Sequence, residues 1–99
     1  MTDPARLPAN TPRAPESSET RLKRLKLRSW RRGTREMDLI FGRWFDAEAT
    51  VLSEADLDAY ERLMEENDWD LYYWITGARE TPERAVPLVE RIARFHEMR

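Results

Sequence analysis

Apolar residues recur along the chain at the three- and four-residue spacing of helices, in five separate segments. The clearest segment predicts a helix with one buried stripe, formed by Met37, Ile40, Phe41, Trp44 and Phe45. We interpret Gly42 as a residue off this stripe that mildly weakens the helix. No segment shows the sustained alternation of apolar and polar residues that is typical of strands.

A second helix is predicted before this stripe, from Thr20 to about Trp30, with its exit near Gly33. A third follows the stripe, with Ser53 as N-cap and Asp56 as the third residue of a capping box. It runs to about Glu66, and its expected buried residues are Leu57, Tyr60, Leu63 and Met64. The expected buried residues of the first of these helices are Leu22, Leu25 and Ser29.

Two shorter helices complete the pattern. Asn67 or Asp68 can cap the fourth, and Gly77 suits its C-terminal end, with an inner face of Leu71, Trp74 and Ile75. The fifth contains Pro87, so either a short turn precedes a helix starting at about Pro87 or one helix is kinked there. Its apolar residues Leu88, Val89, Ile92 and Phe95 share a face. The predicted fold is therefore all-α, a compact bundle of about five short helices.

Residues 1–19 hold four of the six prolines and few apolar residues, which predicts a disordered N-terminal tail before a helical domain at 20–99. A mitochondrial presequence is less favoured here, because Asp3, Glu16, Glu19 and the prolines do not suit one. No apolar run approaches a membrane-spanning length, and no secretory signal is evident. We expect a soluble protein of the bacterial cytoplasm, with no membrane insertion.

The chain has no Cys and one His, which excludes disulfides, thiolate zinc sites and a Cys nucleophile. We interpret His96 as a partly exposed residue at a helix end, because no nucleophile or second ligand can be named beside it. The sixteen acidic residues after position 35 are interpreted as solvated surface. These observations predict no catalytic residue and no metal site.

Charge is divided unevenly along the chain. Residues 1–35 hold ten Lys or Arg and three acids, whereas residues 36–99 hold seven Lys or Arg and sixteen acids. A basic segment of this kind meets nucleic acid, an acidic protein, or the acidic half of its own chain. A small nucleic-acid-binding module that uses the basic 21–35 segment is therefore one functional hypothesis.

The charged stretch from Arg31 to Asp38 surrounds Gly33 at a predicted helix junction. In one interpretation Gly33 ends a helix, and Glu36 and Asp38 are favourable acids in the first turn of the next. In the other, Gly33 lets a partner backbone approach, and Arg32 and Glu36 offer contacts of opposite charge beside it. The residues alone favour the first interpretation.

Residues 28–38, RSWRRGTREMD, resemble the R-G-x-x-E-x-D signature of the SdhE-type FAD assembly factor family, which is related to mitochondrial succinate dehydrogenase assembly factor 2. The similarity covers roughly residues 20–98. It continues through LIFGRWF at 39–45, LSE at 52–54, Tyr60-Glu61, Leu63, DWDLYYWITG at 68–77, Ile92, Phe95 and His96. Thr34 departs from the Met of many members, and the turn at 67–70 lacks their common Pro.

The resemblance implies a helper rather than an enzyme. Such proteins bind the flavoprotein subunit of succinate dehydrogenase, often also of fumarate reductase in bacteria, and promote covalent attachment of FAD to a His of that subunit. It implies no cofactor of its own, since FAD belongs to the partner, and we expect a monomer that does not bind nucleic acid. The partner-binding residues that it implies are Arg31, Arg32, Gly33, Glu36 and Asp38, of which Asp38 would brace the loop or also contact the partner. Tyr72 and Tyr73 cannot both point inward, and we add Tyr72 as the exposed aromatic residue of the site.

Overall fold

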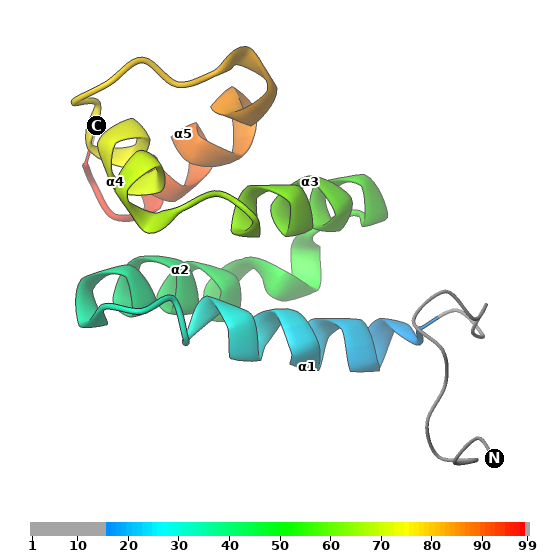
Figure 1. Ribbon diagram of the computed structural model, residues 1–99. Coiled ribbons are helices and arrows are strands. Elements are labelled where there is room, and N and C mark those ends of the chain that lie inside the picture. Colours follow the sequence, from blue (N-terminus) through cyan, green and yellow to red (C-terminus); the bar gives the residue numbers. More distant parts are fainter. Residues whose placement is uncertain (1–15, 99) are drawn as a thin grey trace, which may run out of the picture.

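The computed structural model describes residues 16–98, which form five α-helices and two short 3-10 helices (Figure 1). The α-helices are α1 (Ser18–Ser29), α2 (Arg35–Glu48), α3 (Glu54–Met64), α4 (Asp68–Thr76) and α5 (Val86–Phe95). The 3-10 helices are η1 (Ala49–Val51) and η2 (Glu83–Ala85), and the described residues contain no strand. The prediction of an all-α bundle is confirmed.

The predicted tail falls mostly on residues 1–15, which lie outside the described residues. Its last part belongs to the first helix instead. The Ser17 side chain caps α1 by accepting a hydrogen bond from the backbone N–H of Thr20 at 3.1 Å, so α1 begins two residues before its predicted start.

The helix ends follow the local signals in the sequence. Ser53 and Asp56 form the predicted capping box of α3, and Asn67 rather than Asp68 caps α4. Gly77 ends α4 in the left-handed conformation, with φ 81°. The short turn before α5 is the 3-10 helix η2, so the first of the two alternatives for Pro87 is correct, and the proline occupies the first turn of α5.

The core forms where the apolar faces of all five helices meet, and the predicted stripe of α2 lies within it. Tyr60 of α3 is fully buried among aromatic rings, with centroids 5.2 Å from Phe45, 5.3 Å from Trp44 and 6.4 Å from Phe41. In Figure 1, α1 and α2 lie side by side as a helical hairpin, and α3 lies above them. The helices α4 and α5 lie together at the upper left, above α2. The packed core therefore holds both helix junctions, 30–34 and 65–67, in place.

A buried hydrogen-bond chain links α1 to this core. The Ser29 hydroxyl donates to the carbonyl oxygen of Leu25 at 2.7 Å, and its oxygen lies 2.6 Å from the Tyr60 hydroxyl. Because the single Ser29 proton is used by Leu25, Tyr60 donates to Ser29. Burial raises the pKa of Tyr60, so its hydroxyl stays protonated and remains a donor.

Two single residues have a role that the sequence pattern did not predict. Gly42 is more than a residue that mildly weakens α2: it is buried, and a Cβ there would lie closer than 3.0 Å to three ring atoms of Trp30. Glycine is needed because the indole packs directly on the α2 backbone. Phe95 has the helical spacing of the inner face of α5, but it is not buried with the other residues of that face. It is 44% exposed because α5 ends there, and its ring packs edge-on against His96 instead.

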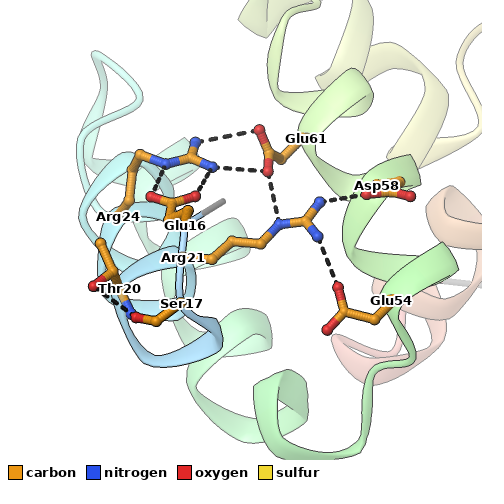
Figure 2. Close-up of polar contacts among 8 residues, drawn as sticks. All are labelled: Glu16, Ser17, Thr20, Arg21, Arg24, Glu54, Asp58 and Glu61. Atoms are coloured by element: carbon orange, nitrogen blue, oxygen red, sulfur yellow. Dashed lines mark hydrogen bonds and ion pairs between the residues drawn. The ribbon is translucent and has the colours of Figure 1, made fainter. Parts of the chain in front are cut away.

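The basic face of α1 meets the acidic face of α3 (Figure 2). Arg21 contacts three acids, with its Nη1, Nη2 and Nε atoms 2.9 Å from Glu54, 2.6 Å from Asp58 and 2.8 Å from Glu61. Arg24 bridges Glu61, at 2.9 Å, and Glu16, at 2.8 Å. These arginines lower the pKa values of Glu61 and Glu16, because both carboxylates accept charged hydrogen bonds. Arg21 and Arg24 of the basic segment thus pair with acids of α3 in the acidic half of the chain.

Among the described residues, no helix is both long enough and apolar enough to cross a membrane.

Candidate functional site: a groove at the Gly33 junction

The Arg32 side chain turns inward at the junction between α1 and α2. It is only 9% exposed, and its Nε and Nη2 atoms lie 2.9 and 2.8 Å from Oδ1 of Asp68. Its Nη1 donates to the carbonyl oxygen of Met64 at 2.8 Å, and Nη2 donates to that of Glu66 at 2.9 Å. These carbonyls lie at the end of α3, where no further backbone N–H of the helix can donate to them. The Arg32 side chain supplies the missing donors.

Two further contacts fix the loop around Arg32. Its backbone N–H donates to Oδ1 of Asp38 at 2.6 Å, so the Asp38 side chain braces the loop from the first turn of α2. Its guanidinium carbon lies 5.6 Å from the centroid of the Phe41 ring, a cation–π distance. The loop is therefore tied to α2, to α4 and to the end of α3 at once.

Gly33 follows Arg32 with φ 127°, a backbone conformation that other residues rarely adopt. A Cβ at this position would lie 3.4 Å from Oδ2 of Asp68, the carboxylate that pairs with Arg32. Gly33 itself is exposed. Its lack of a side chain thus serves the folded loop and also leaves the outer backbone uncovered.

A groove of about 400 Å³ opens beside Gly33, between the start of α2 and the start of α4. Its lining residues are Gly33, Thr34, Glu36, Met37, Asp68, Trp69 and Tyr72. Met37 is buried and forms an apolar floor, whereas the Trp69 indole is 71% exposed. A smaller hollow of about 270 Å³ between α3 and the start of α5 contains none of the predicted site residues.

The structure brings Gly33, Glu36 and Tyr72 together in this groove. Glu36 is exposed, and it forms no ion pair with any residue from 16 to 98. Tyr72 is half-buried at the edge of the core. Arg31 is exposed in the adjoining loop, while Arg32 and Asp38 are partly buried and hold the loop in place. The predicted set therefore divides into exposed groups and groups that hold them.

The sequence interpretation missed Trp69 and Asp68 as parts of this site. Trp69 stacks on Tyr73 with centroids 6.3 Å apart, and the Arg79 guanidinium carbon lies 4.6 Å from the Tyr73 centroid. An aromatic residue two positions after the Asn67 cap was the available signal. A Trp at an exposed position in the first turn of a helix has no role in the core, and exposed aromatics are enriched at interfaces.

The hypothesis of a nucleic-acid-binding module finds no support. Six of the eight basic residues between 21 and 35 form ion pairs with acids within the described chain, and only Arg31 and Arg35 do not. Phosphate binding needs such side chains to be free for the backbone of the nucleic acid. The paired face carries little charge for a polyanion to bind.

His96 occupies the C-cap of α5, half-buried as predicted for a helix-end residue. Its Nε2 atom lies 2.7 Å from the carbonyl oxygen of Ile40, so the ring links the end of α5 to the middle of α2. Within residues 16–98, no group of three or more His, Asp or Glu side chains is arranged to hold a metal ion.

The fold and the groove define a small all-α module whose charged and aromatic surface is held by buried supports. A family model described as flavinator of succinate dehydrogenase matches residues 23–96, and the chain belongs to that family. The match spans both the Gly33 junction and α4.

Curated relatives carry the name succinate dehydrogenase assembly factor 2, mitochondrial. The protein from Mycosarcoma maydis is 38% identical over 81 residues, which cover 82% of this chain and 33% of the relative. The Yarrowia lipolytica protein is 33% identical over 91 residues (87% and 63%), and the Danio rerio protein 38% over 79 residues (78% and 50%). The chain thus spans between one third and two thirds of these relatives' lengths.

These names correct one prediction. The sequence analysis expected a protein of the bacterial cytoplasm, but the similar curated proteins are named as mitochondrial proteins of eukaryotes. The expectation rested on the absence of a clear targeting signal within residues 1–19. Composition is weak evidence on this point, because a presequence and a polar tail share Arg, Ser and Thr.

Proposed function

We propose that the chain is an assembly factor that binds the flavoprotein subunit of succinate dehydrogenase and promotes covalent attachment of FAD to it. The flavoprotein of fumarate reductase is a second candidate partner. The observation that carries the proposal is the family match across residues 23–96, which includes the whole groove. The names of the relatives, all succinate dehydrogenase assembly factors, support the same assignment.

In this proposal the groove beside Gly33 is the partner-binding surface. Gly33 offers an uncovered backbone, and Glu36 offers a carboxylate that no cation between residues 16 and 98 neutralises. Arg31 adds an exposed cation, and Tyr72 and Trp69 add aromatic surface. A charged group with an aromatic neighbour is a favourable composition for an interface. The charged group forms directional hydrogen bonds, and the aromatic ring buries a large apolar area.

The chain's contribution is positioning rather than chemistry. FAD and the reacting His both belong to the partner, so the bond forms between groups that the helper does not supply. Binding that holds the partner in a reactive conformation can contribute about 7–11 kcal/mol where orientation is favourable. The chain accordingly acts without a cofactor of its own, as a monomeric non-enzymatic helper.

Co-expression tests this function directly. The flavoprotein subunit is produced with and without the chain in a strain that lacks its native helper, and covalent flavin is read as in-gel fluorescence after denaturation. We expect fluorescence at the flavoprotein band to depend on the chain. Equal fluorescence in both strains, at equal amounts of flavoprotein, would refute the proposal.

A further inference from the structure

The partner-binding residues implied by the family resemblance include Arg32, but in the structure its side chain binds residues of its own chain. The guanidinium contacts other residues of the chain: the Asp68 carboxylate, the sulfur and carbonyl oxygen of Met64, the carbonyl oxygen of Glu66, and the face of Phe41. With only 9% of the side chain exposed, little of it is left for a partner. A contact residue would have to break these bonds first, which is costly for a buried charge.

The pair formed by Arg32 and Asp68 joins two segments that are 36 residues apart in sequence. Each member is followed at once by a residue of the groove: Gly33 after Arg32, and Trp69 after Asp68. A bond between the two side chains therefore sets the distance between these two surface residues. The second carboxylate oxygen of Asp68 also faces Gly33, 3.4 Å from where its Cβ would be.

The rest of the local structure depends on the same pair. Thr34 caps α2 and Asn67 caps α4, so α2 begins three residues after Arg32 and α4 begins at Asp68 itself. Displacement of Arg32 would also free the Met64 and Glu66 carbonyls at the end of α3. Arg32, which does not line the groove, thus fixes the surface from behind, whereas Asp68 lies at its edge.

We propose that Arg32 and Asp68 are positioning residues that hold Gly33 and Trp69 in one docking surface, and that Arg32 does not contact the partner. This inference rests on the proposed function, since the surface matters only if a flavoprotein binds there. It assigns a role to Asp68, and it makes Trp69 part of the surface. It also means that Arg32 and Asp68 act as one unit.

A double-mutant cycle on partner affinity separates the two roles of Arg32. The variants are Arg32→Lys, Asp68→Asn and the two combined, and the probe is the purified flavoprotein subunit in isothermal titration. We expect each single variant to bind about ten-fold more weakly and the combination to lose no more than either alone, because residues that act through one pair are not additive. Glu65→Gln is the matched control, since it removes only an exposed pair with Arg28, and it should bind as the unmodified chain does.

A second measurement tests the surface without the partner. The amide signals of the three glycines can be followed by nuclear magnetic resonance. We expect Asp68→Asn and Arg32→Lys to move the Gly33 signal and to leave that of Gly77 in place. Asp68→Glu, which keeps the charge, should restore part of the affinity, and circular dichroism establishes that each variant is folded at the titration temperature.

The outcomes are distinct. Asp68→Asn binding as tightly as the unmodified chain, with Arg32→Lys weakened, would mean that Arg32 contacts the partner, and the inference would be overturned. A Gly33 signal unmoved in both variants would overturn it as well. An unmodified chain that does not bind the flavoprotein would instead refute the proposed function.

Discussion

The packing of Trp30 on Gly42 gives a prediction that sequence propensity alone would reverse. Alanine is favoured over glycine inside a helix by about 1 kcal/mol, so Gly42→Ala would stabilise an isolated α2. In the structure, however, three atoms of the Trp30 ring, Cδ2, Cε2 and Cε3, lie closer than 3.0 Å to the position of the added methyl group. The ring must therefore move away from the backbone.

The cost follows from what the indole loses. Its Nε1 atom donates to Oδ2 of Asp46 at 3.2 Å, and its ring packs on the α2 backbone at Gly42. Overpacking of this kind costs about 1–3 kcal/mol, and the helix propensity of alanine offsets about 1 kcal/mol of it. We expect Gly42→Ala to destabilise the chain by up to about 2 kcal/mol, with a fall in Tm of about 4–8 °C for each kcal/mol in a domain of this size.

The assay is urea unfolding followed by circular dichroism, on Gly42→Ala, on Trp30→Ala and on the double variant. Once the indole is absent, the three atoms nearest to the added methyl group are gone. Gly42→Ala should then be stabilising by about 1 kcal/mol in the Trp30→Ala background. A stabilising effect in the unmodified background would refute the reasoning, because it would mean that the ring does not rest on Gly42.

Two further predictions concern the core and the α1–α3 ion pairs. Trp44→Ala should cost about 3–5 kcal/mol because the side chain is fully buried, whereas Trp69→Ala, at a 71% exposed position, should change the unfolding free energy by no more than about 0.5 kcal/mol; equal effects in urea unfolding would contradict the assignment of the core. Arg24 and Arg21 lower the pKa of Glu61 below its ordinary value of 4.5, so this group adds stability above that pH, and the contribution is lost as the pH falls through the lowered pKa. Glu61→Gln should therefore lose less stability between pH 7 and pH 3 than the unmodified chain, and an equal loss would show that the pairs do not act through Glu61.

Much of the fold could be predicted because its signals are local. The capping box at Ser53, the Asn67 cap and the left-handed Gly77 are each decided within four residues, and the α2 stripe follows from spacing alone. The role of Gly42 could not be predicted, because it depends on where the Trp30 ring of a neighbouring helix lies. The exposure of Phe95 could not be predicted from its spacing, because α5 ends at that residue and the side chain lies outside the core.

The candidate site shows the same division. The exposed position of Gly33 and Glu36 could be expected from a charged junction with a glycine. The inward turn of Arg32 could not, because its main partner, Asp68, is 36 residues away. The sequence likewise left open what the basic segment meets. The structure answers with the chain's own acids, since Arg21 and Arg24 pair with residues of α3.

The measurement that tests the docking surface most directly is the covalent flavin yield of a Glu36→Ala variant. Glu36 lies in the first turn of α2, so its loss should cost the fold only about 0.3–1 kcal/mol, whereas a charge-assisted bond to a partner would be worth about 1.5–3 kcal/mol. Glu83→Ala is the matched control, an exposed acid in the first turn of η2. With both variants folded by circular dichroism, flavin fluorescence of the flavoprotein should fall sharply for Glu36→Ala and stay unchanged for Glu83→Ala. Full flavin attachment with Glu36→Ala would contradict the assignment of the groove as the partner-binding surface.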